Sequence, residues 1–336
     1  MKQIDRNTKG IALVVDDSGK LLGTITDGDL RRLVLAGSDL SLPASWLLHR
    51  RAAAPVTGAA ATSPSEQLRI MRKNKIRHLP LLARDGAVVE LAMLDDFAAE
   101  SPGPALSAVV MAGGEGSRLR PLTDHTPKPM LPIGDKPLVE RTIEQLRQAG
   151  VSELFLATHY KNERFSSYFG DGSDFGVSIS YLNEEQPLGT AGALSRLAEA
   201  QGPLLIVNGD ILTNLNFRSM VAFHQESAAD MTVAVRHYEF RVPYGVVTTD
   251  GVQVKGLVEK PEHKFLVNAG IYLLEPEMCK QVPRDTRFDM TDLIATLLAR
   301  GRKVIAFPVS EYWIDVGDLG NYEQARADAD KELQNP

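Results

Sequence analysis

Cysteine is nearly absent from this chain of 336 residues, because Cys279 is the only one. A single cysteine excludes a disulfide within the chain and a metal site built from thiolates, and it fits a reducing compartment. We interpret Cys279 as a small, packed core residue. Long apolar runs are also missing, since no stretch of the sequence approaches the roughly 18 residues of a membrane span. The amino terminus has no apolar segment of the signal-peptide kind, so we predict a cytoplasmic protein with no membrane partner.

An excess of positive charge is missing as well. The 37 Lys and Arg residues are outnumbered by 43 Asp and Glu, and the formal net charge is −6. This balance excludes the general basic field that holds nucleic acid, so any binding of phosphate must be local. Hydrophobic residues make up 43% of the chain, which is enough for real cores. The length fits two domains, since domains commonly hold roughly 100–200 residues.

Glycine, by contrast, is concentrated in one segment. The short β-branched run Ser107–Met111 is typical of a buried parallel strand, and a bend with three glycines in four positions follows it, at Gly113, Gly114 and Gly116. Glycines let backbone N–H groups approach a phosphate with no Cβ atom in the way. A second bend holds Lys128 between two prolines, which fix the direction of the lysine. The two bends together indicate a phosphate site.

Two widespread phosphate-binding loops do not fit this spacing. The dinucleotide fingerprint G-x-G-x-x-G, counted from Gly114, needs a third glycine where Leu119 stands. The P-loop needs Gly-Lys-Ser/Thr, whereas Gly116 is followed by Ser117 and Arg118. A glycine-rich turn on its own also serves as an ordinary tight turn, so the interpretation depends on the longer string.

That string resembles the signature of the sugar-1-phosphate nucleotidyltransferases, G-G-x-G-x-R-L-x-P-L-T followed by P-K-P-M-L-P-I, and the resemblance runs from about Leu106 to Tyr322. It implies that a sugar 1-phosphate attacks the α-phosphorus of a nucleoside triphosphate and releases pyrophosphate. The catalytic cations that it implies are Arg118, Lys128 and Lys260. The nucleotide-binding residues that it implies are Ala112, Gly113, Gly114, Gly116, Ser117, Glu184, Gly189 and Thr190.

Two further segments are similar to the metal-binding motifs of that family. They are V-N-G-D, which ends at Asp210, and W-I-D-V-G, which contains Asp315, and the resemblance implies that the two aspartates hold Mg²⁺. The alternative for each aspartate is an ordinary solvated turn. The residues that the resemblance places on the sugar phosphate, besides Lys260 of the E-K-P motif, are Asn208, Gly245, Glu259 and Asn268.

The identity of the nucleotide base is harder to infer from the sequence. The segment that begins at Glu184 resembles the guanylyltransferase form, and one carboxylate can accept hydrogen bonds from guanine N1–H and the exocyclic amine together. We therefore predict GTP as the nucleotide and a GDP-sugar as the product, as in the glucosamine-1-phosphate and mannose-1-phosphate guanylyltransferases of bacterial surface-glycan pathways. Three alternatives stay open. The first is that Glu184 and Glu185 are solvated loop charges. The second is that the enzyme is a uridylyltransferase or uses another base. The third is that the domain is a catalytically silent nucleotide sensor.

Residues 1–100 contain an internal repeat. Residues 10–30 and 76–97 each have the pattern of strand, turn, strand and helix. Two such half-units resemble a CBS pair, a regulatory or assembly module that binds adenosyl or guanosyl ligands, here with a truncated first repeat. Thr26 and Asp29 stand where a ribose or phosphate would be held, and a purely structural or dimerising module is the alternative. Because such modules associate face to face, we expect a homo-oligomer.

Residues 105–336 alternate short apolar strands with helices, which predicts an α/β catalytic domain after a linker at residues 101–104. We expect a doubly wound, Rossmann-like mixed sheet with ligands beyond the carboxyl ends of its strands, preceded by the small α/β CBS-pair domain. One helix is predicted over residues 137–149 and ends before Gly150. The other predicted strands cover residues 154–158, 204–208, 231–235 and 304–307.

Overall fold

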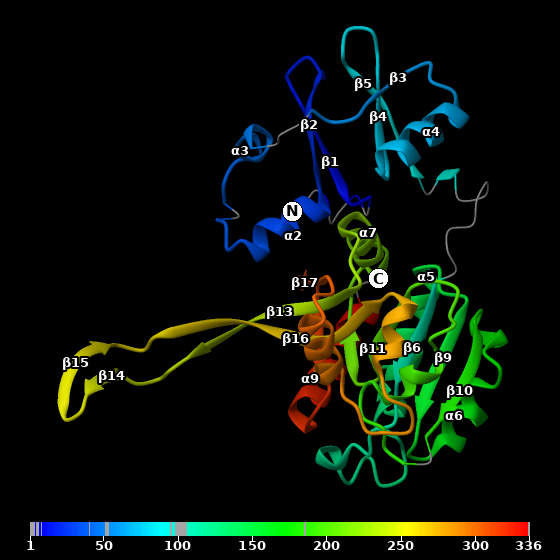
Figure 1. The fold of residues 1–336 in the computed structure, drawn as a ribbon, viewed down its shortest axis with the longest axis vertical. Helices are drawn as coiled ribbons and strands as arrows, with labels where there is room; N and C mark the ends of the chain where they lie inside the picture. Colours follow the sequence, from blue (N-terminus) through cyan, green and yellow to red (C-terminus); the bar gives the residue numbers. More distant parts are fainter. Residues whose placement is uncertain are drawn as a thin grey trace. The chain divides into compact units, whose positions relative to one another are not determined.

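A seven-stranded sheet organises the computed structural model, which describes residues 4, 7, 9–39, 41–50, 54–94, 96–97, 106–184 and 186–334. The strands follow the order β10-β9-β6-β11-β16-β13-β17, and β16 runs antiparallel to both of its neighbours, whereas all other pairs are parallel. Their bounds are Ser107–Met111 (β6), Glu153–Thr158 (β9), Ser178–Asn183 (β10), Leu204–Asn208 (β11), Met231–Arg241 (β13), Glu262–Leu274 (β16) and Val304–Val309 (β17). The predicted doubly wound mixed sheet is confirmed (Figure 1).

Helices follow strands of this sheet, and several of them contribute buried side chains to the core. They are α5 (Leu138–Gln148), α6 (Asn162–Phe169), α7 (Phe217–Ser227), α8 (Met290–Ala299) and α9 (Leu319–Gln334). The helix predicted over residues 137–149 is α5, and Gly150 follows it with a φ of 100°. The α5 side chains Leu138, Ile143 and Leu146 are fully buried, as expected for the apolar stripe of a surface helix. Because β6 and β11 are buried on both faces, their sequences are continuous apolar runs.

The chain reverses its direction of travel across the sheet next to β6. It runs outward from β6 through β9 to β10 and then returns to β11 on the other side of β6. In open α/β sheets such a switch point leaves a crevice outside the carboxyl ends of the strands. Met111 at the end of β6 lies directly beside Asn208 at the end of β11. The fold therefore brings the glycine-rich bend and the segment of Asp210 to one place.

Small two-stranded sheets connect the loops around this crevice. They pair β7 (Pro132–Ile133) with β8 (Lys136–Pro137), and β12 (Ile211–Thr213) with β18 (Trp313–Asp315). Short 3-10 turns form η2 (Ser117–Leu119), η3 (Lys128–Met130), η4 (Ser173–Phe175), η5 (Gly192–Arg196) and η6 (Pro276–Gln281). Cys279, in η6, is buried and makes no disulfide, which confirms its interpretation as a packed residue.

Two strands of the main sheet continue far beyond it. β13 was predicted only as far as residue 235, but it extends to Arg241 and stays paired with β16 up to Glu262. The antiparallel pair of β14 (Val246–Asp250) and β15 (Gln253–Val258) ends this ribbon. We call residues 236–267 the arm, and it projects away from the sheet as a two-stranded ribbon (Figure 1).

The N-terminal part forms a separate unit with residues Met1–Ala105, with which Val221–Ser227 of α7 cluster. Its elements with described bounds are two antiparallel hairpins and three helices, namely β1 (Ile11–Val15), β2 (Leu21–Thr26), α2 (Asp27–Leu35), α3 (Ala44–His49), α4 (Pro64–Asn74), β4 (His78–Leu82) and β5 (Val88–Met93), with the short β3 (Gly58–Ala59) beside β4. Both predicted strand–turn–strand repeats are therefore present. Most of the helix expected after the second repeat lies outside the described residues. The linker at residues 101–104 lies entirely outside them. In the part of the chain that the structure describes, no helix is long and apolar enough to cross a membrane.

Removal of a core side chain tests the role of the sheet in stability. Leu156 of β9 is fully buried, at 0% exposure, whereas Leu298 of α8 is 57% exposed. Leu156→Ala is expected to lower the free energy of unfolding by about 2–5 kcal/mol, because it removes buried methyl groups and leaves a cavity. Leu298→Ala is the matched control and is expected to change it by no more than about 0.5 kcal/mol. Denaturant unfolding of both variants measures the difference, and equal effects would contradict the placement of Leu156.

Candidate active site

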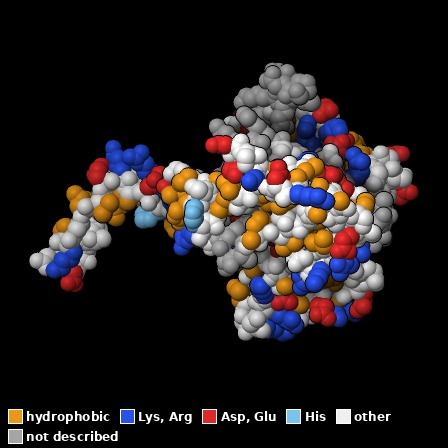
Figure 2. All heavy atoms as spheres, turned by 90° about the horizontal axis from the view of Figure 1, so that it is seen from above, with side chains coloured by type: hydrophobic (Ala, Val, Ile, Leu, Met, Phe, Trp, Pro, Cys, Tyr) orange, Lys and Arg blue, Asp and Glu red, His pale blue; other side chains and the backbone are white. Residues whose placement is uncertain are grey.

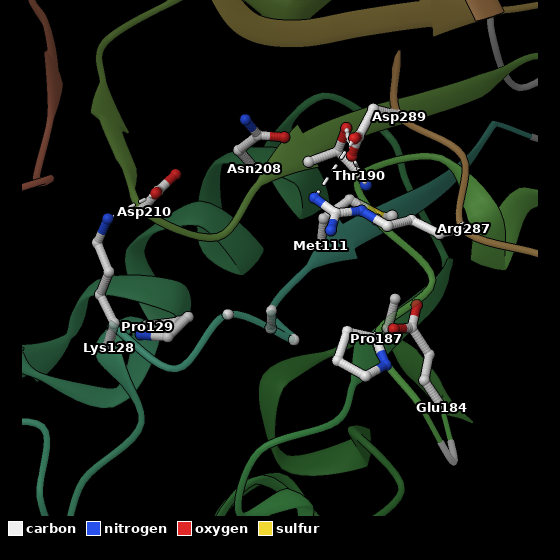
Figure 3. Close-up of a pocket in the computed structure, with 15 residues that line it drawn as sticks. Met111, Lys128, Pro129, Glu184, Pro187, Thr190, Asn208, Asp210, Arg287 and Asp289 are labelled. Carbon is white, nitrogen blue, oxygen red and sulfur yellow. Dashed lines mark hydrogen bonds and ion pairs between the residues drawn. The ribbon is translucent and has the colours of Figure 1, made fainter. Parts of the chain in front are cut away.

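A cavity of about 280 Å³ lies at the carboxyl ends of the central strands. Its wall includes Met111 at the end of β6, the start of the glycine-rich bend at Ala112, Gly113 and Gly114, and Asn208 at the end of β11. Figure 3 shows its side chains converging from separate loops that follow different strands. The other residues of the wall are Lys128, Pro129, Ala157, Glu184, Pro187, Gly189, Thr190, Asp210, Arg287 and Asp289.

The two bends predicted from the sequence pack against each other. Gly116 has a φ of 65°, and a Cβ atom there would come within 2.9 Å of both Lys128 Cβ and Thr123 Cγ2. The Thr123 hydroxyl donates a hydrogen bond of 2.9 Å to the Gly116 carbonyl. Glycine is required at position 116 for both its backbone conformation and this close approach. Gly116, Ser117 and the exposed Arg118 do not line the cavity itself, since they lie one turn further along the chain.

Lys128 connects the second bend to the two aspartates. Its Nζ donates a hydrogen bond of 2.6 Å to Asp210 Oδ2 and lies 3.9 Å from Asp315 Oδ1, although Lys128 is only 7% exposed. The pairing of Ile211 with Asp315, between β12 and β18, brings together aspartates that are far apart in sequence. The Val316 amide also donates to the Asp210 carbonyl. The structure thus groups one ammonium and two carboxylates, as the sequence motifs predicted.

The Asp315 carboxylate is less well compensated than that of Asp210. Burial, and next to it the negative charge of Asp210, raises the pKa of the Asp315 carboxyl, whereas Lys128 and Arg118 lower it. Asp315 Oδ1 is buried without a hydrogen-bond donor, and within the described residues Asn208 Oδ1 is the other buried side-chain oxygen in this condition. An unpaired buried oxygen is costly unless it meets a donor or a cation.

The available donors fit a hard divalent cation. Carboxylate and amide oxygens are the ligands that Mg²⁺ prefers, and it keeps several waters or phosphate oxygens of its own. The described residues form no group of three or more His, Cys, Asp or Glu that could hold a metal ion. Two aspartates with an unsatisfied oxygen therefore match an ion that shares its coordination with a substrate phosphate rather than one in a protein cage.

Glu184 lies on the opposite wall of the cavity, just after β10 (Figure 3). Burial raises the pKa of its carboxyl, and the Leu188 amide, which donates a hydrogen bond of 3.1 Å to Oε2, partly offsets this effect. Oε2 thus has a backbone donor that fixes the direction of the carboxylate. The half-buried position differs from that of a freely solvated loop charge. Glu185, its neighbour in sequence, lies outside the described residues.

Thr190 and Gly189 are placed by a residue that sequence reasoning missed. Asp289 accepts hydrogen bonds from the Thr190 amide at 2.9 Å and from its hydroxyl at 3.3 Å, across 99 positions of sequence. A Cβ atom at Gly189 would lie 2.6 Å from Asp289 Oδ1. Asp289 also begins α8 with a capping box to Asp292. That spacing could have predicted a helix start, but no local signal indicates its contact with Thr190 or the presence of Arg287 in the wall.

Besides Asp315, four other predicted residues do not line the cavity. Asn268 lies in β16, where its side chain bonds the Tyr272 hydroxyl and the Gly270 amide. Gly245, Glu259 and Lys260 lie on the arm, where the Lys260 amide donates to the Tyr244 carbonyl and a Cβ atom at Gly245 would lie 2.9 Å from Glu259 Oε2. Of the residues predicted for the sugar phosphate, Asn208 therefore lines the cavity with the nucleotide residues, whereas Gly245, Glu259, Lys260 and Asn268 do not.

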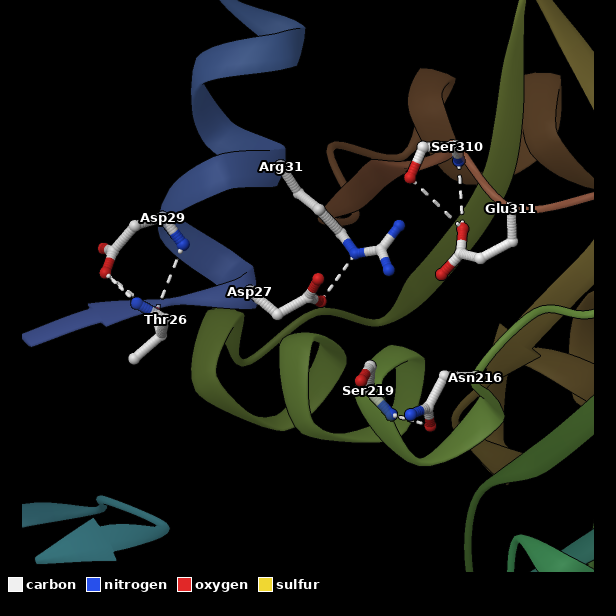
Figure 4. A network of polar contacts seen from close by, with 8 residues as sticks. All are labelled: Thr26, Asp27, Asp29, Arg31, Asn216, Ser219, Ser310 and Glu311. Carbon is white, nitrogen blue, oxygen red and sulfur yellow. Dashed lines mark hydrogen bonds and ion pairs between the residues drawn. The ribbon is translucent and has the colours of Figure 1, made fainter. Parts of the chain in front are cut away.

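Thr26 and Asp29, in the N-terminal unit, are engaged with each other. The Asp29 carboxylate accepts from the Thr26 amide and hydroxyl, each at 2.8 Å, and the Asp29 amide donates to Thr26 Oγ1 at 3.2 Å (Figure 4). This capping box starts α2. A separate apolar cavity of about 270 Å³ in the same unit is lined by residues that include Ile25, Leu30 and Trp46, but by neither of these two polar side chains.

Comparison with known proteins adds to this geometry. The sequence pattern of the Nucleotidyl transferase family matches residues 107–332, and that of the CBS domain matches residues 1–36. A mannose-1-phosphate guanylyltransferase of Mycobacterium tuberculosis is 33% identical over 230 residues, which cover 66% of this chain and 64% of that protein. The chain thus spans a little less than two thirds of that relative. A D-glycero-alpha-D-manno-heptose 1-phosphate guanylyltransferase of Aneurinibacillus thermoaerophilus is 32% identical, over 68% of this chain and 99% of its own length.

Solved structures agree with the sequence comparison. A putative glucose-1-phosphate thymidylyltransferase of Bacillus anthracis superposes with a TM-score of 0.55 at 25% identity, over 67% of this chain and 95% of its own. HddC of Yersinia pseudotuberculosis superposes with a TM-score of 0.53 at 26% identity, over 66% and 98%. The cavity at the switch point, the glycine-rich bend and these similarities agree, and the chain belongs to the nucleotidyl transferase family, with a CBS domain at its amino terminus.

Proposed function

We propose that the protein transfers the guanylyl group of GTP to a sugar 1-phosphate and so makes a GDP-sugar and pyrophosphate. The observation that carries this proposal is the group of Lys128, Asp210 and Asp315, of which Lys128 and Asp210 line a cavity together with the glycine-rich bend. Backbone N–H groups of a glycine-rich bend suit phosphate oxygens, and the cation and carboxylates suit a triphosphate with its metal. The named activities of several relatives support the same reaction class.

In this reaction a phosphate oxygen of the sugar 1-phosphate forms a bond to the α-phosphorus of GTP. The bond from that phosphorus to the bridging oxygen breaks, and its electron pair leaves with pyrophosphate. Because both substrates are anions, the site must oppose their charge and hold them in line. Lys128 would bind triphosphate oxygens, and the positive charge of Arg118 acts to lower the pKa of the Asp315 carboxyl. Mg²⁺ held by Asp210 and Asp315 would neutralise charge on the phosphates.

Guanine is proposed as the base because Glu184 is a half-buried carboxylate whose direction is fixed by the Leu188 amide. Such a group would accept from N1–H and the exocyclic amine of guanine. HddC, one of the similar structures, also exists as a complex with GMP-PN. Uracil is the second candidate, since a UTP–glucose-1-phosphate uridylyltransferase of Synechocystis is 32% identical over 68% of this chain. A silent nucleotide sensor is disfavoured, because the expected cations and aspartates are all in the sequence.

We further propose that residues 1–100 act as a CBS-pair module for regulation or assembly, that residues 105–336 form the catalytic domain, and that the enzyme is cytoplasmic. The sequence pattern of the CBS domain supports the first part. An adenosyl or guanosyl ligand held by Thr26 and Asp29 would have to share these side chains with the capping box of α2. The sugar is proposed only as a class, which includes mannose, heptose and glucosamine 1-phosphates.

Replacement of either aspartate tests the metal site. Asp210→Asn and Asp315→Asn are each expected to lower turnover by at least about two orders of magnitude, because each removes a charged metal ligand at constant volume. Asp174→Asn, at an exposed position in η4, is the matched control. Mg²⁺ should raise the melting temperature of the wild type and the control more than that of either variant. Near-normal turnover of both variants at saturating Mg²⁺ would refute the metal assignment.

The choice of base is tested by a panel of nucleotides. If Glu184 contacts guanine, GTP should exceed UTP, ATP and dTTP in kcat/KM by at least about a hundredfold, since other bases do not offer this half-buried carboxylate two donors. Glu184→Gln should reduce this preference more than it reduces turnover, because an amide has one acceptor oxygen and no charge. Glu199→Gln, at an exposed position, is the control. A wild type that prefers UTP, or an unchanged preference in Glu184→Gln, would exclude the guanine contact without excluding nucleotidyl transfer.

A further inference from the structure

The arm separates two halves of the candidate machinery. Gly245, Glu259 and Lys260 belong to motifs for the sugar phosphate, yet no residue of the arm lines the cavity that holds Lys128 and Asp210. The E-K-P turn is nevertheless well formed. Lys260 has a φ of 47°, an uncommon conformation for a residue other than glycine, and its amide donates to the Tyr244 carbonyl at 3.3 Å. The arm thus presents a defined cation that its own cavity does not use.

The direction of the arm is fixed by backbone pairing. β13 and β16 pair residue by residue from Arg236 and Val267 to Arg241 and Glu262, with no interruption of register along this length. Beyond them β14 and β15 pair with each other, and a strand pair of about 15 residues on each side reaches about 50 Å at roughly 3.3 Å per residue. Lys260 reaches its own cavity only if the ribbon bends sharply, for example at the bulge between Val233 and Val235.

The surface of the arm is unusually apolar. Of the eighteen large hydrophobic side chains exposed in the described part of the chain, ten lie on the arm. The most exposed are Val252 at 105%, Tyr244 at 74% and Leu257 at 65%. Figure 2 shows hydrophobic side chains along the arm where it projects from the body. Exposed apolar clusters of this kind mark interaction surfaces, and a two-stranded ribbon alone is at best marginally stable in water.

We propose that two copies of the chain exchange arms, so that the arm of each copy brings Glu259 and Lys260 to the cavity of the other. A second copy is favoured as the partner because the cavity and the arm carry complementary parts of one motif set. The exposed apolar side chains of one arm amount to on the order of 1,000 Å², and a reciprocal exchange of two arms reaches the area that a stable dimer needs. The exchange also closes a twofold assembly, in which each contact occurs twice.

This inference rests on the proposed function, because it assigns the source of a cation for the sugar phosphate. Each composite site would contain Lys128, Asp210 and Asp315 from one copy and Lys260 from the other. A copy that is defective only in its cavity and a copy that is defective only in its arm should therefore complement each other. An arm that folds back over its own cavity would allow no such rescue, since each site would then carry one defect.

Complementation is tested with Asp210→Asn and Lys260→Ala chains that carry different affinity tags and are produced together. The doubly tagged dimer is purified and assayed with GTP and a sugar 1-phosphate below saturation. One of its two composite sites is intact, so it should have about half the activity of a doubly tagged wild-type dimer. Each variant alone should be nearly inactive under these conditions. If the mixed dimer is no more active than the two single variants, the proposed arm exchange is wrong.

A second measurement is independent of catalysis. Tyr244→Ser combined with Leu257→Ser removes two exposed apolar anchors of the arm, and Leu298→Ser on α8 is the matched control. Sedimentation should give a dimer for the wild type and the control, and a smaller species for the double variant. Hydrogen exchange should then become faster both in the arm and at the cavity wall around Gly113. If the wild type transfers no nucleotide, the proposed function fails, and these two readouts still decide the exchange. An arm variant with unchanged assembly and protection would overturn it.

Discussion

The parallel pairing of β6 with β11 is the constraint on which the candidate site depends. Residues that end neighbouring parallel strands must share one edge of the sheet, so Met111 and Asn208 lie side by side. The glycine-rich bend and Asp210 follow directly, and the crevice at the switch point opens between them. The core packing of these strands, with Val109, Val110, Ile206 and Val207 at 0% exposure, holds the edge in place. The geometry of this site thus depends on apolar residues that do not line the cavity.

Charge balance then determines what the cavity can hold. Lys128 partly compensates Asp210 and Asp315, yet one oxygen of Asp315 stays buried without a donor. The site is therefore polarised before any ligand arrives, with more negative oxygens than one ammonium satisfies. A triphosphate with its divalent ion would bring both charges that the wall lacks, the cation for the carboxylates and the anion for Lys128. On the proposed function, such mutual compensation would favour the joint binding of substrate and metal.

Much of the fold could be predicted from the sequence, because its signals are local. Buried parallel strands are short apolar runs, and the predicted strand over residues 204–208 matches β11. The contact between Asp289 and Thr190 could not be predicted, since 99 positions separate the two residues and neither belongs to a shared pattern. The motifs named Lys128, Asp210 and Asp315, which the structure brings together. The sequence motifs could not predict the direction of the arm, because the spacing of residues along a hairpin does not determine how the hairpin is oriented relative to the sheet. The Thr26–Asp29 cap, by contrast, is visible in the spacing T-x-x-D.

The single cysteine has a practical consequence. Cys279 is buried in η6 with 0% exposure, and burial raises the pKa of its thiol to about 12. Thiolate, rather than thiol, reacts with alkylating and disulfide-forming reagents. The single cysteine of the folded protein is therefore expected to react very slowly with thiol reagents. One cysteine introduced anywhere on its surface would be the sole reactive site, so spin labels, fluorophores or cross-linkers could be attached to a chosen position without prior removal of Cys279.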